Sequence, residues 1–384
     1  MEPIAFCGSD RQLYVLDAID RPPRRLTDEP GATHTWPTWA PGRAALAAMR
    51  RPRGRQAEQA SVELWLDLPA AAGPMDAPRP VWTARNGGPI CLGWAPDGRH
   101  LGMLVQEADD LHLLVADRDG FDARPVASGA PLYWSWTANG QALVVHVGGH
   151  YRYGEGARVV LVRLDGSAAR ETLCTRPLGF RAPACDPAGA RVAYAADETG
   201  DRTLVVLDLA SGQKAALALV GDEPAFTWAP DGSQLAVAGS RAESGLYDDL
   251  AVVDARGGVA RPLGVSALAF FWTPDSAALI CAVPDPVGEG LAWERVEVVD
   301  GRARRLASFS PTQELALLLG HFDQYAQTCC LYSREEPLLL FAYASDQARH
   351  NGRAAEHAEL WLVRGEGPAT LQRLAGGSIG FFAP

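Results

Sequence analysis

A short turn motif, Trp-x-Pro-Asp-Gly, recurs along this chain and limits what the chain can fold into. The string WAPDG stands at Trp94–Gly98 and again at Trp228–Gly232. Aligned on its first position, further copies begin at Trp39, Trp136, Cys185, Trp272 and Tyr332, and a last fragment, FFAP, ends at Pro384. The spacings from Trp39 to Phe382 run from 42 to 60 residues, which is typical of one four-stranded blade of a β-propeller.

The residues of the motif suit a tight turn. Proline fixes φ early in the turn, aspartate accepts hydrogen bonds from the backbone that follows it, and glycine takes the left-handed conformation of a sharp reversal. Runs rich in Val, Leu and Ala come after the turns, as expected of strands packed on both faces. We interpret the repeated tryptophans as packing between adjacent blades, because a large aromatic residue at a fixed repeat position normally serves packing.

The repeats predict an all-β fold, a closed β-propeller of eight four-stranded blades in a single domain, residues 1–384. A seven-bladed ring is the alternative if the unit at Tyr332, which lacks the Pro and Gly of the motif, is an insertion. Residues 376–384 resemble an innermost strand and residues 1–30 three further strands, so we expect the termini to pair in one blade and close the ring. The best helical pattern is SPTQELALLLGHF, at Ser310–Phe322.

The turns, the strands LAVAGS and VAYAADETGDRTLVVLDLASG, and the closing pattern of the termini resemble the WD40-like (PD40) repeats of TolB-like propellers. They are also similar to the propeller domain of the dipeptidyl-peptidase and prolyl-oligopeptidase family, without its hydrolase domain. The segment FDQYAQTCCLYSREEPLLLFAY is similar to a late blade of bacterial propellers of this kind. The resemblance covers essentially the whole chain and implies the fold, but these families share no single function.

Composition narrows the function classes. The formal net charge of −11 opposes general binding to nucleic acid or to an anionic membrane, because phosphate groups would repel the average surface. The seven cysteines form no Cys-x-x-Cys pair, so we expect reduced thiols and no zinc site. No apolar run is long enough to span a membrane and no signal peptide is visible, so we expect a cytoplasmic protein without direct membrane insertion.

The sequence contains no clear catalytic motif. A prolyl-oligopeptidase activity requires a Gly-x-Ser-x-Gly nucleophile elbow, which does not occur. The eight histidines form no His-Glu-x-x-His or comparable ligand set, and acidic loop clusters such as Asp109-Asp110 lack the pattern of a calcium loop. We therefore expect a non-catalytic scaffold with no metal and no cofactor. The alternatives are a small-molecule hydrolase or lactonase with a metal in the central channel, and an adaptor subunit of a transporter or of a separate enzyme.

Recognition is expected on one face of the ring, the loop face, which carries the connections between second and third strands and those from one blade to the next. The repeated turns lie on the opposite side, the turn face. Long irregular segments such as RRPRGRQAEQAS and GGHYRYGEGA belong to the loop face. The arginines of the first segment are suited to clamp a carboxylate or phosphate group of a partner.

Aromatic residues gather where the innermost strands begin, and some of them are expected to rim the channel mouth as interaction anchors. The expected partner is another protein or a peptide. The candidate binding residues are Arg50, Arg51, Arg53, Arg55, Trp36, Trp134, His150, Tyr151, Arg152, Tyr153, Phe180, Phe226, Phe271, Asp323, Gln324 and Tyr325.

Overall fold

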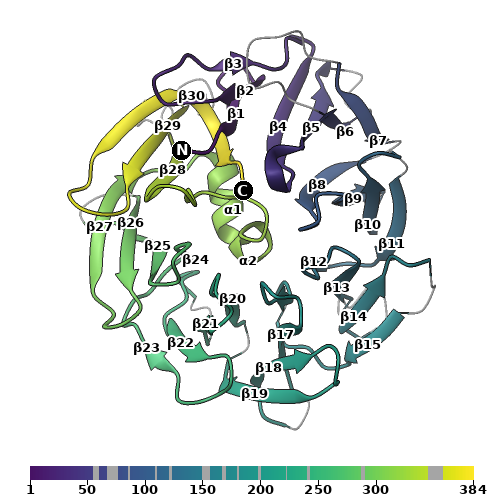
Figure 1. The fold of residues 1–384 in the computed structure, drawn as a ribbon, viewed down its shortest axis with the longest axis vertical. Helices are drawn as coiled ribbons and strands as arrows, with labels where there is room; N and C mark the ends of the chain where they lie inside the picture. Colours follow the sequence, from purple (N-terminus) through teal and green to yellow (C-terminus); the bar gives the residue numbers. More distant parts are fainter. Residues whose placement is uncertain are drawn as a thin grey trace.

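The chain forms a ring of β-sheets around a central axis, with two short helices in the middle (Figure 1). The computed structural model describes residues 1–54, 60–66, 77–84, 87–108, 110–120, 123–148, 156–166, 170–179, 181–197, 200–221, 223–239, 243–286, 290–344 and 358–384. Over these ranges, no helix is both long and apolar enough to cross a membrane.

Six sheets have four antiparallel strands each, ordered along the chain from the channel to the rim, and we number them blades 1 to 6 (Figure 1). Blades 1 to 3 consist of β4 (Ala32–Trp39), β5 (Ala45–Pro52), β6 (Ser61–Leu66) and β7 (Arg79–Thr83); β8 (Gly87–Trp94), β9 (His100–Glu107), β10 (Asp110–Asp117) and β11 (Ala123–Ser128); and β12 (Leu132–Trp136), β13 (Ala142–Val147), β14 (Arg158–Arg163) and β15 (Arg170–Cys174). Blades 4 to 6 consist of β16 (Ala184–Cys185), β17 (Arg191–Ala196), β18 (Thr203–Asp208) and β19 (Lys214–Leu219); β20 (Ala225–Trp228), β21 (Gln234–Ala238), β22 (Ala251–Asp254) and β23 (Arg261–Pro262); and β24 (Ala269–Trp272), β25 (Ala278–Pro284), β26 (Leu291–Glu297) and β27 (Ala303–Phe309).

The remaining strands form one six-stranded closing sheet in the order β28-β29-β30-β1-β2-β3. Its strands are β28 (Leu338–Ala344), β29 (Ala358–Arg364), β30 (Leu371–Phe382), β1 (Ile4–Gly8), β2 (Leu13–Leu16) and β3 (Arg24–Arg25). Ile4 lies opposite Phe382, and Cys7 lies opposite Ile379, so the two ends of the chain pair in the same sheet. The predicted closure of the ring by residues 376–384 and 1–30 is confirmed.

The prediction of eight blades is wrong, because the strands of the described ranges form seven sheets. The 12-residue strand β30 pairs with β29 through its first half and with β1 through its second half, which joins two predicted units into one sheet. The unit at Tyr332 has lost the Pro and Gly of the motif. Its innermost segment forms only the isolated bridges Cys330–Phe382 and Tyr332–Leu339, so it does not build a separate blade.

The repeated turns have the predicted chemistry. Gly98 and Gly232 have φ angles of 66° and 70°, the left-handed region that glycine occupies without steric cost. The Asp97 carboxylate accepts the backbone N–H of Arg99 at 2.8 Å, and Asp231 accepts that of Ser233 at 2.9 Å. The turns therefore lie between the first and second strands of their blades, on one face of the ring, as the motif predicts.

The second strands of blades 3 and 6 are covered on both faces. Every residue of β13 is buried, and so is every residue of β25 except Pro284. Two helices, α1 (Gln313–Gly320) and α2 (Phe322–Tyr325), follow β27 and occupy the centre of the ring instead of its rim (Figure 1). The helix predicted at Ser310–Phe322 therefore exists. Together with α2 it closes one end of the central channel, which becomes a recess open at the other end.

Candidate functional site

The segment that contains α1 and α2 plugs the central channel. Helix α1 begins after Thr312, whose hydroxyl oxygen accepts the Leu315 N–H at 3.2 Å, and the same hydroxyl donates to the Ser378 carbonyl of β30 at 2.6 Å. Leu315, Leu318 and Leu319 of α1 are buried. An ion pair between Arg11 and Glu314 attaches the start of the helix to the β1–β2 connection. The plug is therefore fixed to the closing sheet at its beginning.

Each residue of α2 contacts a different part of the ring. The centroid of the Phe322 ring lies 4.6 Å from the ring centroid of Phe270 in blade 6 and 5.9 Å from that of Tyr247 in blade 5. The Asp323 Oδ2 atom accepts the Ala182 N–H, just before blade 4, at 3.0 Å. The short helix is thus a hub between blades that lie far apart in the sequence.

Gln324 and Tyr325 complete this hub. The Gln324 side-chain carbonyl accepts the Trp134 N–H at 2.9 Å, and its amide N–H donates to the Trp134 carbonyl at 3.1 Å. The Tyr325 hydroxyl donates to the Ile90 carbonyl of blade 2 at 3.3 Å, and its ring stacks on Trp36 of blade 1 at 4.8 Å between centroids. Because innermost strands present one unpaired edge to the channel, these side chains satisfy backbone groups that no further strand reaches.

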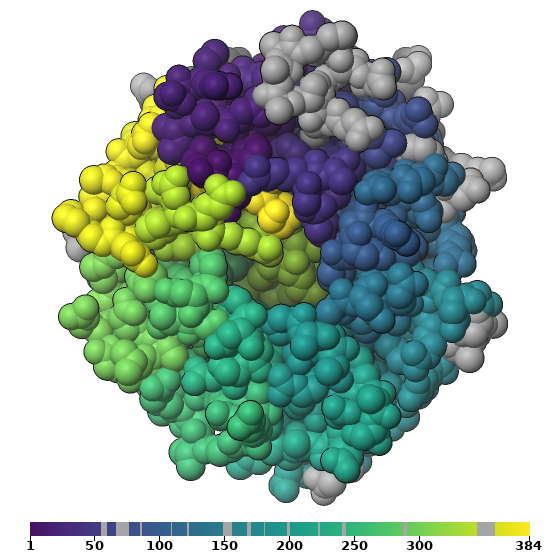
Figure 2. Space-filling model, viewed as in Figure 1, coloured from purple at the N-terminus to yellow at the C-terminus, as the bar shows by residue number. Residues whose placement is uncertain are grey.

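On the turn face, the plug leaves a recess of about 690 Å³ at the centre of the ring. Figure 2 shows this hollow, with yellow-green atoms from the region of α1 and α2 at its bottom. Its walls come from the repeated turns of blades 2 to 6 and from the segment after α2. The aromatic and proline residues of the lining are Trp94, Pro96, Trp136, Pro187, Phe226, Trp228, Pro230, Phe270, Phe271, Trp272, Pro274 and Tyr332.

The tryptophans of the wall hold neighbouring blades together. The indole N–H of Trp94 donates to the Thr38 carbonyl at 2.9 Å, that of Trp136 to Gly93 at 3.0 Å, and that of Trp228 to Ala184 at 2.8 Å. Trp272 makes the same bond to Thr227 at 3.1 Å. Every acceptor is the residue just before the repeat position of the preceding blade, which confirms the interpretation of these tryptophans as packing between blades.

Blade 4 departs from this pattern, because Cys185 stands at the tryptophan position. The Cys185 N–H donates to the Ser135 hydroxyl at 3.2 Å, which replaces the missing indole contact with blade 3. The next residue, Asp186, is buried and accepts from the Arg191 side chain at 2.9 Å, and the Arg191 guanidinium lies 4.7 Å from the centre of the Trp228 ring. The carboxylate of Asp186 is therefore neutralised within the fold.

Three cysteines line the recess, and all are uncharged at neutral pH. Burial raises the pKa of the Cys185 thiol to about 12 and the pKa of Cys329 well above its usual value of 9.0. The pKa of Cys330 is also raised by burial. A thiol in this state is a weak nucleophile and a poor metal ligand. Within the described ranges, no group of three or more His, Cys, Asp or Glu side chains could hold a metal ion.

Two polar atoms of the lining have no hydrogen-bond partner among the described residues. They are Asp323 Oδ1 and Thr227 Oγ1, both buried. The other oxygen of Asp323 accepts the Ala182 N–H, so one oxygen of this carboxylate is buried without a hydrogen-bond partner among the described residues. The recess thus has an apolar aromatic wall, and its lining also includes the exposed polar residues Gln327 and Arg334.

The aromatic candidates from the sequence are parts of this wall and plug rather than of an exposed rim. Trp36, Trp134 and Phe226 are buried, and Phe271 is partly buried. Trp36 lies under Tyr325, whereas Phe226 and Phe271 line the recess. Phe180 lies outside the described residues.

Asp323, Gln324 and Tyr325 were predicted to present a binding surface on the loop face. All three are buried, and their polar groups bind the backbone of blades 2, 3 and 4. The expectation that they lie exposed is wrong, because sequence position alone does not show that this connection folds inward. The sequence did suggest a helix at Ser310–Phe322, but the inward course of the chain depends on contacts with residues 141 to 235 positions away.

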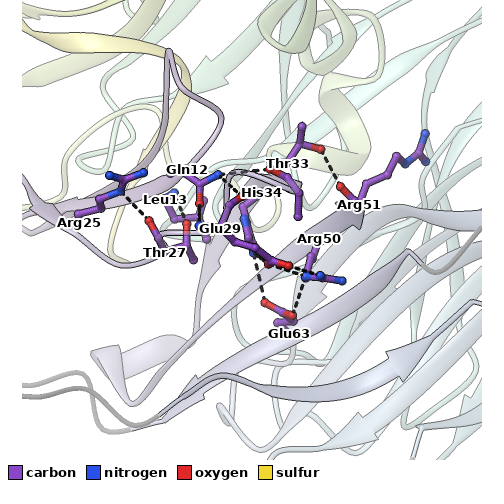
Figure 3. A network of polar contacts seen from close by, with 11 residues as sticks. Gln12, Leu13, Arg25, Thr27, Glu29, Thr33, His34, Arg50, Arg51 and Glu63 are labelled. Carbon is purple, nitrogen blue, oxygen red and sulfur yellow. Dashed lines mark hydrogen bonds and ion pairs between the residues drawn. The ribbon is translucent and has the colours of Figure 1, made fainter. Parts of the chain in front are cut away.

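The predicted arginine cluster divides into two kinds of residue (Figure 3). Arg50 turns toward Glu29 and Glu63: its Nε atom lies 2.8 Å from Glu29 Oε2 and 3.5 Å from Glu63 Oε1. The hydrogen bond from Arg50 lowers the pKa of Glu29. Arg50 is thus engaged inside blade 1 and is not available to clamp a partner.

Arg51 and Arg53 are exposed at the end of β5 that lies opposite the repeated turn. The side chain of Arg51 points away from the network around Glu29 (Figure 3). Recognition by these two arginines stays a prediction. Arg55 and the segment His150, Tyr151, Arg152 and Tyr153 lie outside the described residues.

The recess itself was not foreseen from the sequence. Thr227, Cys185 and Gln327 belong to its lining, and none of them stood out as a candidate. One available signal was the departure of blade 4 from the motif at Cys185, which replaces the bulkiest side chain of the repeat with a small one.

No protein-family model matches this sequence, and no curated protein matches it. Among solved structures, a prolyl endopeptidase shares 10% identity with a TM-score of 0.55, over 91% of this chain and 50% of that chain. An oligogalacturonate lyase in complex with manganese shares 14% identity with a TM-score of 0.51, over 74% of this chain and 76% of that chain. TolB from Acinetobacter baumannii shares 14% identity with a TM-score of 0.45, over 77% of this chain and 75% of that chain.

The similarities to the prolyl endopeptidase and the oligogalacturonate lyase support the β-propeller fold and nothing finer. This chain spans about half the length of the prolyl endopeptidase, and identities of this size do not carry an activity from one propeller to another. Function therefore has to be argued from the recess and from the surfaces of this chain.

Proposed function

We propose that this chain is a non-catalytic recognition module of the TolB-like propeller type, which binds a peptide or a segment of another protein in the recess on the turn face. The observation that carries the proposal is the recess itself, about 690 Å³ of apolar, aromatic-walled space closed at one end by α2. Ligand sites in proteins commonly measure roughly 300–1,000 Å³ and combine apolar walls with a few polar groups.

The rigidity of the recess supports binding. Four wall tryptophans are fixed by their indole hydrogen bonds, and the floor is fixed by the contacts of α2 with blades 1 to 6. A site whose side chains are already ordered loses little conformational entropy when a ligand binds, which raises affinity. Aromatic side chains in such sites are frequent anchors for a partner chain.

The state of the titratable groups favours binding over catalysis. Asp186 is paired with Arg191, and the thiols of Cys185, Cys329 and Cys330 are neutral. Acid–base catalysis usually depends on groups whose pKa values lie near the working pH and which can exchange a proton with the substrate. Asp323, the other carboxylate of the lining, has one oxygen without a hydrogen-bond partner among the described residues, and that oxygen is itself buried.

A selection of peptides from a random displayed library on the intact protein tests the proposal. Peptides enriched on the wild-type protein should lose binding to Gln327→Trp, because Gln327 is exposed and lines the recess, and a large side chain there obstructs it. The double variant Arg51→Ser, Arg53→Ser serves as the matched control on the loop face and should bind the peptides as the wild type does.

Three results would contradict the proposal. They are failure to enrich any peptide, equal binding by Gln327→Trp, and loss of binding only in the arginine variant. The last result would instead support recognition through the loop face. Assays for esterase, lactonase and peptidase turnover, run on the same preparation with elemental analysis for divalent ions, are expected to give no turnover above background.

A further inference from the structure

A smaller pocket adjoins the recess. It measures about 150 Å³, and its lining comes mainly from the turn of blade 6, residues 273–275, and from the segment 332–337. Three residues, Pro274, Tyr332 and Arg334, line both this pocket and the recess, so the two spaces meet at these residues. A segment bound in the recess can therefore extend past this junction.

The recess presents one accessible charge to a ligand. Among the described residues, its lining contains three charged side chains, those of Asp186, Asp323 and Arg334. Asp186 and Asp323 are each 3% exposed, and Asp186 also pairs with Arg191 at 2.9 Å. Arg334 is exposed. The charge that an incoming ligand meets is therefore positive.

The backbone at Arg334 is held in place, and its guanidinium lies near the recess wall. The buried carboxylate of Glu2 accepts the Arg334 N–H at 2.7 Å and the Glu335 N–H at 2.9 Å. Burial raises the pKa of the Cys330 thiol, and the positive charge of Arg334 acts against this rise. Because Cys330 lines the recess, the charge of Arg334 acts at the recess wall.

The acidic residues next to Arg334 in the sequence are occupied by other cations. Glu335 and Glu336 pair with the ammonium group of Met1 at 3.1 and 3.2 Å, and Glu335 also pairs with Arg43 at 3.1 Å. The side chain of Arg334 makes no hydrogen bond and no ion pair in the part of the chain that the structure describes. Its donors are thus available to a ligand.

The acidic residues of the smaller pocket lie beyond the junction. Asp275 accepts the Thr273 hydroxyl at 2.6 Å, and Glu366 is exposed. Neither belongs to the lining of the recess. The buried Arg295, which also lines the smaller pocket, pairs with Glu297 at 2.9 Å. A negative group of a ligand is therefore favoured at the junction, beside Arg334, and not further along.

We infer that the segment bound in the recess carries a carboxylate, which pairs with the guanidinium of Arg334 while an adjacent apolar residue packs on the aromatic wall. A guanidinium offers parallel N–H donors that match the two oxygens of a carboxylate. The C-terminus of a chain and the side chain of an aspartate or glutamate supply the same group. This inference rests on the proposed function and specifies the charge of the bound segment.

Blocked amino acids and dipeptides test the inference without a known partner. N-acetylphenylalanine carries a free C-terminal carboxylate, which N-acetylphenylalaninamide lacks. N-acetyl-Glu-Phe-amide carries an acidic side chain, which N-acetyl-Gln-Phe-amide lacks. In titrations followed by NMR, the wild-type protein should bind the charged member of at least one pair about fivefold more tightly, the effect of a well-formed ion pair open to water. The pair that shows the preference identifies the source of the carboxylate.

Arg334→Gln is the decisive variant, because it removes the charge and keeps the backbone N–H that binds Glu2. Its preference for the charged probe should fall below about twofold. Arg99→Gln is the matched control: Arg99 is also exposed and follows the repeated turn of blade 2, but it lies outside the lining of the recess. This control should keep the wild-type preference. Circular dichroism checks the fold of both variants.

Salt dependence provides a second measurement, on the unaltered protein. The pair with Arg334 is open to solvent, so added sodium chloride should reduce the preference of the wild type for the charged probe. The inference is overturned if salt leaves the preference unchanged, if neither pair shows a preference, or if no probe binds. It is also overturned if the preference persists in Arg334→Gln, or if Arg99→Gln loses it equally.

The library selection separates this inference from the proposed function. Peptides that lose binding to Gln327→Trp but bind Arg334→Gln as tightly as the wild type would leave the proposed function standing and refute the carboxylate anchor. Peptides that ignore Gln327→Trp would refute the proposed function itself.

Discussion

Replacing Phe322 by alanine should destabilise the whole propeller, because the phenyl group of Phe322 is the hydrophobic anchor of the plug. Phe322 is 1% exposed and lies 4.6 Å from Phe270 and 5.9 Å from both Tyr247 and Phe271. Removal of a buried phenylalanine typically costs about 3–5 kcal/mol, through lost burial and the cavity that remains. The upper part of this range applies if the aromatic neighbours cannot close the space.

The expected loss corresponds to a measurable thermal shift. Unfolding entropy near roughly 2.1 cal/mol/K per residue gives about 0.8 kcal/mol/K for a chain of 384 residues, so 3–5 kcal/mol lowers the melting temperature by about 4–6 °C. Urea unfolding followed by tryptophan fluorescence measures the free energy directly. Hydrogen exchange at β12 and β24 then shows whether the loss of the anchor exposes the channel edges that α2 covers.

Leu317→Ala is the control, because Leu317 belongs to the same plug but is 44% exposed. It should change the free energy of unfolding by less than about 1 kcal/mol. If Phe322→Ala costs no more than Leu317→Ala, then α2 occupies the channel without stabilising the ring, and the interpretation of α2 as a hub between blades is refuted.

Three further predictions concern other contacts. Trp228→Phe removes the donor to the Ala184 carbonyl and should lower the free energy of unfolding, measured in urea, by about 1–3 kcal/mol. Trp82→Phe is the control and should lower it less, because the Trp82 indole has no hydrogen bond in the described residues. Burial lowers the pKa of His146 to about 4, below its ordinary value of 6.5, so stability should be full above pH 6.5 and fall by about 3 kcal/mol as the pH drops to 4; His146→Asn should show a shallower pH dependence. Arg50→Ser should lower the free energy of unfolding by about 1 kcal/mol, because it breaks the pairs with Glu29 and Glu63. Arg51→Ser should lower it by less than about 0.5 kcal/mol. Equal effects would contradict the conclusion that Arg50 is engaged inside the fold and Arg51 is not.

Those features of the fold that depend on local chemistry could be predicted from the sequence. The Asp-Gly turns need only a side-chain acceptor and a left-handed residue within a few positions, and both stand in the motif at Asp97-Gly98 and Asp231-Gly232. The closure of the ring was likewise visible, because neither terminus can bury its apolar strands without the other.

The number of blades could not be predicted from the spacing of the repeats, because spacing does not show which repeats form a complete blade. A repeat position counts as a blade only if its innermost segment pairs as a strand, and the segment at Tyr332 forms isolated bridges instead. Without the Pro and Gly of the motif the turn there is not specified locally. The continuous strand β30 then joins the last unit to the N-terminal strands in one sheet.

The plug could not be predicted because its signal is not local. In the sequence, Asp323, Gln324 and Tyr325 resemble any polar and aromatic loop, and their partners Ala182, Trp134 and Ile90 lie 141, 190 and 235 positions away. Only the three-dimensional ring brings these backbone groups to one axis. The prediction of an exposed surface failed there for this reason.

Several residues that line the recess stand where the sequence departs from the repeated motif. A propeller needs its turns and wall tryptophans to be alike, because each fills the same gap between blades. The recess is lined at two positions where the tryptophan of the motif is replaced, Cys185 in blade 4 and Tyr332 before the closing sheet. Cys185 replaces an indole with a small side chain, and Tyr332 lies in the segment that follows α2. Asp323, which also lines the recess, comes from the plug, outside the repeats altogether. The regular part of the sequence thus builds the ring, and the irregular part gives its channel a chemistry that a symmetric propeller would not have.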